Sequence, residues 1–579
     1  MGAITLRMRI ESRLRRPVGR LGLAITVLVL ATAPAFLFFD PVDFIPRRGH
    51  VPREPLGIYT LFSDDVAYVS GSRTWPRTLS NLFVPHNTHI VPAWRVLTWA
   101  LVTAAGRLER VPDVLAVASY AILVAVMLLT GRVVARESGQ TILGLVAMVL
   151  VGTTSLMLVP ATWYSAGQPL WAGFGMLATL WYAQSYRRSG RMAALALAAA
   201  SAPLAGWFWT VGHLAGPVAA VYLWVDGRRW CRLAATAPLA ASLLAVALSL
   251  AIGGRRIDST ISFHGRSVRN AVSPVLGLFH TGQAIPENLV FANLGLTVHT
   301  TQAQGALLSL GVILLWSSRW WLYRLRPLRA GTISRQPGPA SGTTRSLCPL
   351  ECAGAALVLG SYAIEWVFRG YMDYQYLRTI SLRFVVPWYD AIPQIGAVLL
   401  TMGWWAATRP ETARLRVITT HKSVTLWGIL GVGTLAVLLI ALNRPRVDAA
   451  VRNSVPSLLR SERESKLFAL PRHQTLRANL LLMGRAEWQR RHLRRLDRCE
   501  ETARRMGLGR DAIRAAFVHP WIPATFIVLS PTQYDLYDAV ALLDLPEQGR
   551  QVDPPTVRGA LAEFLAEDSE PRPFWLGPQ

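Results

Sequence analysis

Separate apolar runs of about 16 to 22 residues recur along this chain, with polar segments between them. A helix of that length crosses roughly 30 Å of hydrocarbon. The chain has 579 residues, of which 52% are hydrophobic and 16% charged, a balance too apolar for a soluble protein of this size. The sequence therefore predicts an all-α polytopic membrane protein.

The runs number about eleven, each a candidate transmembrane helix. The first, 21–39, follows an arginine-rich amino terminus and resembles a signal peptide, but we interpret it as an uncleaved signal anchor because many runs follow it. We expect a location in the bacterial plasma (inner) membrane, with the amino terminus in the cytoplasm. The later runs lie near 111–130, 141–159, 168–185, 192–208, 210–225, 232–252, 304–323, 350–368, 391–407 and 424–442.

The segment 91–107 decides the orientation of everything after it. If it lies on the membrane surface as a juxtamembrane amphipathic helix, every short loop follows the positive-inside rule. The loops expected in the cytoplasm are then rich in arginine, whereas the opposite short loops 160–168 and 209–212 contain no arginine or lysine. Counting 91–107 as a span would invert this pattern, so we predict that it does not cross.

Three long loops are then expected on the exported side: 40–110, 253–303 and 369–390. We predict two domains, a transmembrane domain over 1–442 and an extramembrane domain over 443–579. By parity the second is also exported, since long domains translocate largely regardless of charge. Its amphipathic, short-strand and helical patterns predict a small α or α+β domain.

The formal net charge of +26 does not indicate a nucleic-acid partner. In a membrane protein, arginine gathers in cytoplasmic loops for topological reasons, so membrane lipids are the expected partners of these charges. The four cysteines are scattered and lack the spacing of a zinc motif or a disulfide framework. Composition and cysteine spacing therefore assign no metal or cofactor.

Asp64 and Asp65 form an acidic pair soon after the first span, in the loop expected to be exported. Adjacent carboxylates repel each other, and partial burial raises the pKa of at least one of them toward that of a useful base. The alternative is that one aspartate caps a helix beginning at Val66, an ordinary role for this residue type. The two interpretations are compatible, since one carboxylate can cap while the other faces a substrate.

Further along the same loop, His86, Asn87 and His89 lead into the juxtamembrane helix. Their side chains suit a phosphate or an acceptor, and together with the aspartates they are donor types that a divalent metal accepts. An interfacial turn with solvated histidines is the alternative. The segment is therefore a candidate substrate site, with the question of a divalent metal left open.

The order of these features resembles the GT-C superfamily of membrane glycosyltransferases, which take sugars from polyprenyl-phosphate carriers. The resemblance covers 20–442 and rests on the cytoplasmic amino terminus, the acidic pair, the histidine segment before a juxtamembrane helix, and the basic short loops. It implies a hexosyl- or pentosyltransferase with a polyprenyl-phosphate-linked sugar donor and a glycan, lipid or protein acceptor. Asp64 or Asp65 would be the base. The family's His-Pro-Pro segment is replaced here by His-Asn-Thr-His-Ile-Val-Pro, which leaves the role of that segment open.

Two further segments on the expected exported side suit a lipid-phosphate site. Trp163, Tyr164 and Gln168 join the third and fourth spans, where they either contact a sugar ring or belong to an interfacial aromatic belt. Arg378 and Arg383 precede the tenth span, where a planar guanidinium either holds the carrier phosphate or faces lipid headgroups.

Two other functions stay open beside the glycosyltransferase. A lipid or glycan transporter, or flippase, would place ionisable groups along a path inside the membrane, whereas here the polar features gather in the exported loops. A noncatalytic membrane scaffold of the same fold is the other alternative, because a fold by itself does not determine a function.

Overall fold

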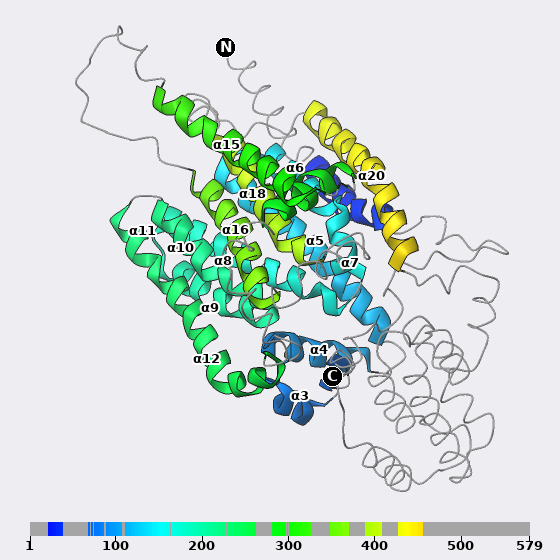
Figure 1. The fold of residues 1–579 in the computed structure, drawn as a ribbon, viewed down its shortest axis with the longest axis vertical. Coiled ribbons are helices and arrows are strands. Elements are labelled where there is room, and N and C mark those ends of the chain that lie inside the picture. The colour runs from blue at the N-terminus through cyan, green and yellow to red at the C-terminus, as the bar shows by residue number, and fades with distance from the viewer. Residues whose placement is uncertain are drawn as a thin grey trace, which may run out of the picture.

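The protein is described by a computed structural model that covers residues 21–38, 68–69, 71–72, 74–85, 89–106, 111–162, 164–225, 228–261, 281–296, 298, 300–325, 348–369, 388–407 and 426–454. Every regular element in these ranges is a helix, as the predicted all-α class requires (Figure 1). The predicted extramembrane domain lies outside the described residues from position 455 onward, so its fold and its export stay predictions.

A helix lies on each predicted apolar run. Four helices are long and apolar enough to cross a membrane, or five when one bent pair is counted as a single span. They make the chain a membrane protein, while the count of about eleven spans stays a prediction. The helices on the runs are 21–38, α5 (Val111–Ser138), α6 (Thr141–Gly152) with α7 (Leu158–Thr162), α8 (Gln168–Ser189), α9 (Met192–Phe208), α10 (Ala215–Val225), α12 (Thr236–Ile261), α15 (Gln302–Leu325), α16 (Pro349–Arg369), α18 (Ala391–Ala407) and α20 (Leu426–Ser454).

Small residues let the central helices approach closely. A Cβ atom added to Gly354 of α16 would collide with the backbone of Leu400 in α18, and one added to Gly144 of α6 would collide with the carbonyl oxygen of Gly131 in α5. Lipid tails are as apolar as leucine, so helices in a membrane associate through such close packing rather than through a hydrophobic drive. These glycines therefore hold neighbouring helices at backbone contact.

The third predicted span is broken rather than continuous. The axis bends by 59° between α6 and the segment Ser155–Ala161. The amide of Ser155, freed at the break, donates to Oδ1 of Asn443 in α20 at 3.1 Å, and Nδ2 of Asn443 donates to the carbonyl of Asn293 at 3.2 Å. Asn443 is fully buried, so it replaces the water that would otherwise satisfy the broken backbone.

The predicted juxtamembrane helix is present as α4 (Pro92–Ala105), which follows the short helix α3 (Trp75–Asn81). Proline stands at its amino end and Gly106 ends it with a positive φ of 68°. At 14 residues, α4 is about 21 Å long and too short to cross the hydrocarbon layer. It lies across the ends of the neighbouring helices (Figure 1), while its position on a membrane surface stays a prediction.

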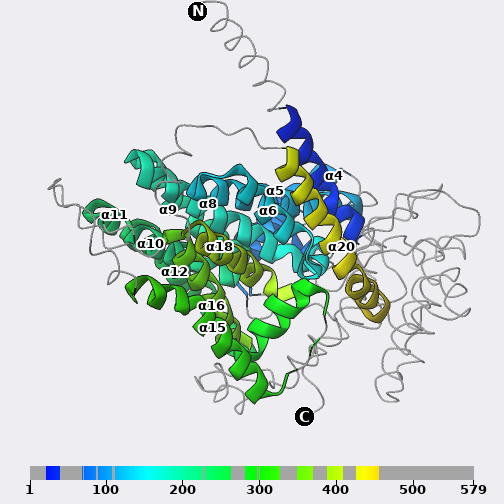
Figure 2. The ribbon, with the colours of Figure 1, turned by 90° about the horizontal axis from the view of Figure 1, so that it is seen from above.

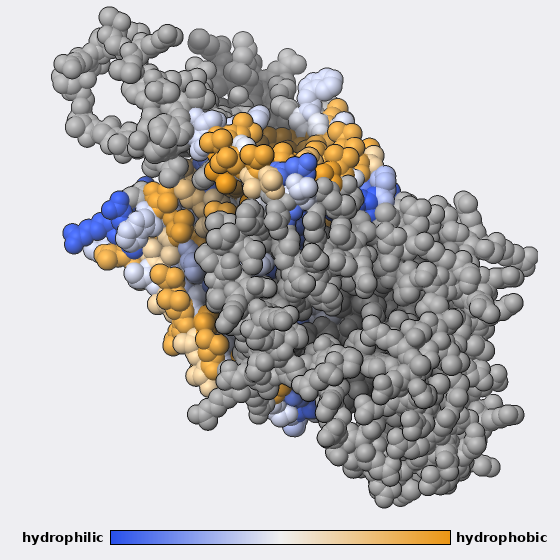
Figure 3. Space-filling view, in the orientation of Figure 1, coloured by the Kyte–Doolittle hydropathy of each residue, from blue (hydrophilic) through white to orange (hydrophobic). Residues whose placement is uncertain are grey.

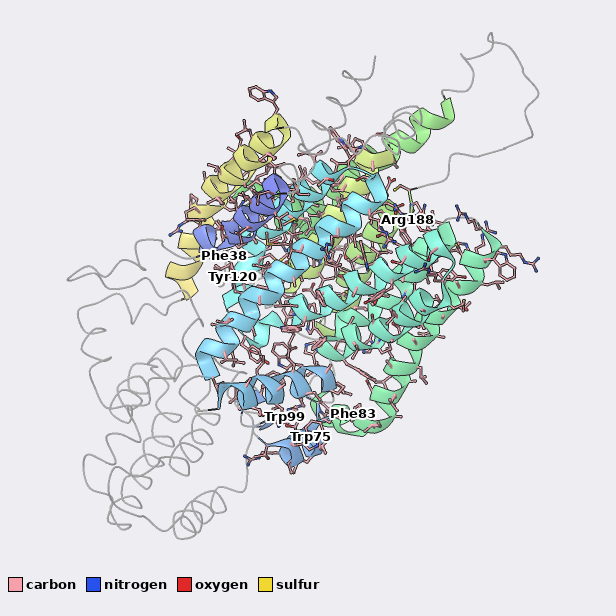
Figure 4. The ribbon with its side chains drawn as sticks, turned by 180° about the vertical axis from the view of Figure 1, so that it is seen from behind. Phe38, Trp75, Phe83, Trp99, Tyr120 and Arg188 are labelled. Carbon is pink, nitrogen blue, oxygen red and sulfur yellow. The ribbon has the colours of Figure 1, made fainter. Side chains whose placement is uncertain are left out.

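The two ends of the helix bundle differ in chemistry. At one end, which we call the arginine end, the Glu137 carboxylate pairs with Arg187 at 2.7 Å and accepts a hydrogen bond from Tyr222 at 2.7 Å. The other end, which we call the aromatic end, is defined by the residues His89, Tyr164, Trp209 and Tyr389. It contains the amino terminus of α8, which runs from Gln168 here to Ser189 at the arginine end. Figure 4 shows Arg188 and the Trp75–Trp99 pair at opposite ends of the molecule.

The loops expected on the two sides of the membrane lie at different ends of the bundle. The termini that carry Glu137, Arg187 and Tyr222 adjoin loops expected in the cytoplasm, and the aromatic end adjoins loops expected to be exported. Which end faces the cytoplasm stays a prediction.

The first described helix lies beside the last one (Figures 1 and 2). The guanidinium of Arg444 in α20 donates to the carbonyl oxygens of Phe36 at 3.1 Å and Leu37 at 3.4 Å. These carbonyls belong to the last turn of helix 21–38, where no amide of the same helix is available to them. One arginine therefore caps the first helix and ties it to α20.

Apolar side chains also cover the outside of the bundle. In Figure 3, hydrophobic residues occupy much of the described surface in view. On α15, Leu307 is 69% exposed and Leu315 is 71% exposed. Such contiguous apolar exposure is unusual for a protein in water and is expected where lipid is the solvent.

The contact between α16 and α18 leads to a first prediction. Gly354→Val is expected to lower the free energy of unfolding by about 1–3 kcal/mol, because the new side chain collides with a backbone rather than with a flexible side chain. Thermal unfolding of the purified protein in detergent measures the change. Gly431→Val in α20 is the matched control, since nothing lies within 4 Å of a Cβ at Gly431. Equal destabilisation by both variants would contradict the packing argument.

Candidate functional site

Three of the ten predicted site residues belong to the described part of the chain: His89, Tyr164 and Gln168. All three are at the aromatic end. The others lie outside the described residues, and their roles stay predictions: Asp64, Asp65, His86, Asn87, Trp163, Arg378 and Arg383.

His89 is a buried residue, 7% exposed, rather than a solvated histidine in a turn. Its Nδ1 shares a hydrogen bond of 2.8 Å with the hydroxyl of Thr210, which begins the 3-10 helix η5 (Thr210–Leu214). The hydrogen bond joins the loop before α4 to the turn between α9 and α10, two segments far apart in sequence. This contact fixes the orientation of one imidazole nitrogen and leaves the ring packed among aromatic residues.

Two aromatic rings extend this group. The ring of Trp209 lies 6.3 Å from that of His89 and is stacked with that of Tyr389 at 5.9 Å and 22°. Tyr389 belongs to the 3-10 turn η9 (Trp388–Asp390), just before α18. His89, Trp209 and Tyr389 thus bring three loops into one aromatic row, and aromatic faces of this kind bind sugar rings by stacking.

Asp390 follows Tyr389 and is almost fully buried. Tyr362 of α16 donates a hydrogen bond of 2.5 Å to its Oδ1. Burial raises the pKa of the Asp390 carboxyl well above its ordinary value, and the charge of Glu365 acts in the same direction. Hydrogen bonds from Tyr362 and Asn288 oppose the rise, as does the positive charge of Arg446.

Tyr164 is committed to the protein interior. Its ring stacks on Trp94 of α4 at 4.3 Å, and its hydroxyl shares a hydrogen bond of 2.8 Å with Thr98 on the same helix. Tyr164 is 3% exposed and Trp94 is fully buried, so this pair fastens α4 to the bundle. One face and the hydroxyl of the predicted sugar-stacking residue are therefore occupied by the chain itself.

Gln168 is buried as well, at the first position of α8. Pro169 follows it, a favourable residue in the first helical turn. The side chain lies in the same connection as Tyr164, between α7 and α8. The connection is therefore part of the packed core at this end and not a loop extended into solvent.

Arg95 places a buried cation beside these aromatic residues. Its Nη2 donates to the carbonyl of Val84 at 3.0 Å, and its guanidinium lies 5.5 Å from the centre of the Tyr68 ring. Among the described residues no carboxylate pairs with it, and burial lowers its pKa from the ordinary value. A buried cation is costly unless an anion compensates it, so this position favours an anionic group nearby.

Within the described residues no group of three or more histidine, cysteine, aspartate or glutamate side chains is arranged to hold a metal ion. The aspartates and His86 of the predicted metal alternative lie outside that part of the chain. The Nδ1 atom of His89 is engaged by the hydroxyl of Thr210.

Sequence reasoning missed Trp209, Tyr389, Asp390 and Arg95. Trp209 lies in a loop that was used only to decide topology, and Arg95 lies inside a segment treated as a surface helix. A signal for Asp390 was present, since Trp388-Tyr389-Asp390 places two aromatic residues and one carboxylate directly before an apolar run. What the sequence did not show was that burial would join the aspartate to distant helices.

The chain is similar to solved structures of the oligosaccharyltransferase from Archaeoglobus fulgidus. The apo form matches with 13% identity and a TM-score of 0.36, covering 77% of this chain and 59% of that one. A complex of the same archaeal enzyme, AglB, with an inhibitory peptide and a dolichol-phosphate matches with 14% identity and a TM-score of 0.34, covering 74% and 55%. No family and no curated protein matches the sequence.

This chain spans about three fifths of the length of the apo enzyme, 59%. At these identities and TM-scores the matches describe similarity alone. We base the assignment of function on the residues of this chain.

The packing of Tyr164 leads to a second prediction. Tyr164→Phe is expected to lower the free energy of unfolding by about 1 kcal/mol, because the hydrogen bond to Thr98 is lost while the ring remains. Tyr164→Ala is expected to cost about 3–5 kcal/mol, because the stack on Trp94 is lost as well. Phe174→Ala, an exposed aromatic position on α8, is the control in the same thermal unfolding assay. An unchanged stability for Tyr164→Ala would show that the ring does not fasten α4.

Proposed function

We propose that the protein is an integral membrane glycosyltransferase that moves a sugar from a polyprenyl-phosphate carrier to an acceptor on the exported face of the membrane. One observation supports this most directly. The segments expected to be exported meet at one end of the bundle, where His89, Trp209 and Tyr389 form an aromatic row. Aromatic rings and a buried histidine are groups that recognise sugars and phosphates.

The position of Arg95 supports a site in the first exported loop. Tyr68 packs beneath Arg95 and follows Asp65 by three residues, a chain length that spans at most about 10 Å. A guanidinium within about 4–6 Å of a carboxylate would favour its ionised form, which is the form that a base needs. It also favours a phosphate at the same place. We propose that this cation serves the reaction by one of these two interactions.

In the proposed reaction, Asp64 or Asp65 accepts the proton of the acceptor hydroxyl. The acceptor oxygen forms a bond to the anomeric carbon while the bond from that carbon to the phosphate oxygen breaks, and polyprenyl phosphate leaves. Arg378 or Arg383 would stabilise the charge that develops on the departing phosphate. The remaining proposed substrate contacts are His86, Asn87, His89 and Trp163, whereas Tyr164 and Gln168 belong to the packed core at this end.

The buried charges of the described residues fit an enzyme better than a transporter. Glu137 and Arg187 pair at the arginine end, and Asp390 lies at the start of α18 near the aromatic end. A transport path would require ionisable groups in succession between these ends. In the described helices, the largest cluster of buried side chains is apolar and rich in leucine, valine and alanine.

The proposed base gives a third prediction. Asp64→Asn or Asp65→Asn is expected to lower the rate of sugar transfer by about two to four powers of ten, because a positioned general base is lost. Transfer from radiolabelled polyprenyl-phosphate sugars by the purified protein in liposomes measures the effect. Asp43→Asn is the matched control, an aspartate of the same loop with no assigned role. If both variants and the control retain full transfer, the proposed base is wrong.

The orientation of the chain is a fourth prediction. Alkaline phosphatase fused within 40–67 or after residue 454 is expected to be active, because both positions are expected to be exported. The same reporter fused within 334–346 is expected to be inactive, since that linker is predicted to be cytoplasmic. An inactive reporter in the first loop would place the acidic pair in the cytoplasm and remove the basis for an exported reaction.

A further inference from the structure

A buried polar junction lies directly behind the aromatic row. Asp390 is 2% exposed, and its carboxylate receives the hydroxyl of Tyr362 from α16 at 2.5 Å. Asn288, in the π-helical segment η6 (Ile285–Phe291), hydrogen-bonds the same carboxyl. Arg446 of α20 contributes a nearby positive charge and donates to the carbonyl of Leu296 at 2.6 Å. Groups from three separate elements thus converge on one carboxylate.

The junction connects directly to the candidate site through the backbone. Asp390 and Tyr389 are adjacent in the turn η9, so fixing the carboxylate fixes the turn that carries the tyrosine. The Tyr389 ring then stacks on Trp209, whose ring lies 6.3 Å from His89. The Tyr389 side chain itself is partly buried in this turn.

We propose that Asp390 is a positioning residue, which through Tyr362 and Arg446 holds Tyr389 against Trp209 as one wall of the sugar-binding site. The proposal rests on the proposed glycosyltransferase function for the identity of the ligand, and on the described contacts for the positioning itself. A carboxylate has two oxygens and accepts several hydrogen bonds at once, so it can anchor a turn to more than one helix. Loss of the Asp390 carboxylate would remove this anchor from the 3-10 turn that carries Tyr389.

The chain contains a matched control at the opposite end of the bundle. Glu137 is also a buried carboxylate that accepts a hydrogen bond from a tyrosine, Tyr222, and lies near an arginine, Arg187. Removing its charge disturbs a junction of the same chemistry that has no connection to the aromatic row. A general loss of stability is therefore distinguishable from a local loss of positioning.

The test is a fifth prediction and uses fluorine NMR of the full chain in lipid nanodiscs. Tyr389 is replaced by 4-trifluoromethylphenylalanine, whose resonance is displaced by the ring of Trp209 when the two are stacked. The variant Trp209→Leu defines the resonance position without the stack. Asp390→Ala is expected to move the signal most of the way to that position, whereas Glu137→Gln is expected to leave it in place.

Conservative variants distinguish the effect of losing hydrogen bonds from the effect of losing side-chain volume. Asp390→Asn keeps one carbonyl oxygen for Tyr362 and is expected to retain most of the original resonance position. Tyr362→Phe is expected to produce an intermediate shift, and it provides the test if Asp390→Ala does not fold. The proposal is wrong if Asp390→Ala and Tyr362→Phe both leave the signal unchanged, or if Glu137→Gln moves it equally.

The transfer assay measures KM for the donor sugar separately from kcat, and a purely structural role of Asp390 would not change KM selectively. With the native Tyr389, Asp390→Ala is expected to raise the KM for the donor sugar at least about five-fold while kcat changes less than about two-fold, the pattern of lost binding rather than lost chemistry. If the wild-type protein shows no transfer, the glycosyltransferase assignment fails while the fluorine experiment still decides the positioning role. A fall in kcat with an unchanged KM would overturn the assignment of Asp390 to positioning.

Discussion

No water is present inside a bilayer to hydrogen-bond a free backbone amide, and this constraint governs the arrangement of the helices. Where the third span breaks after α6, Asn443 of α20 supplies the missing acceptor for Ser155 and also binds Asn293. The break is therefore tolerated only because a distant helix satisfies it. The turn that follows can then carry Tyr164 into the aromatic end, where it secures α4.

Buried charged side chains lie at both ends of the bundle, but their partners differ between the two ends. At the arginine end, Glu137 balances Arg187, so the charges are neutralised where they lie. Near the aromatic end, Asp390 receives hydrogen bonds from neutral groups as well as the field of Arg446, while Arg95 has no described carboxylate beside it. A buried cation is costly without an anionic partner and is useful where an anionic substrate arrives.

Much of the fold was predictable from the sequence, because length and apolarity alone determine where a helix lies in a membrane. The runs at 111–130 and 391–407 coincide with α5 and α18, and the segment 91–107 contains the short helix α4. The bend after α6 was not predictable, because the polar partner of Ser155 lies in α20, far along the chain. Periodicity and charge describe single segments and contain no information about such contacts.

The candidate site was predictable only in part. His89 was correctly placed in a loop before α4, but its burial against Trp209 depends on the turn between α9 and α10, which no local pattern indicates. Tyr164 was chosen for its aromatic ring, yet the ring packs against Trp94. The two aromatic residues before Asp390 are visible in the sequence, but its burial is not, because the partners of its carboxylate come from distant helices such as α16 and α20.

The contact between Arg444 and helix 21–38 also has a consequence for biosynthesis. The two partners are 408 residues apart, so the first helix enters the membrane long before α20 has been made. At about 5–20 residues per second, translation of the intervening chain takes roughly 20 to 80 s. During that interval the last turn of the first helix lacks its capping arginine. Final assembly of the bundle therefore waits for α20, and a chain truncated before it would leave the carbonyls of Phe36 and Leu37 without Arg444.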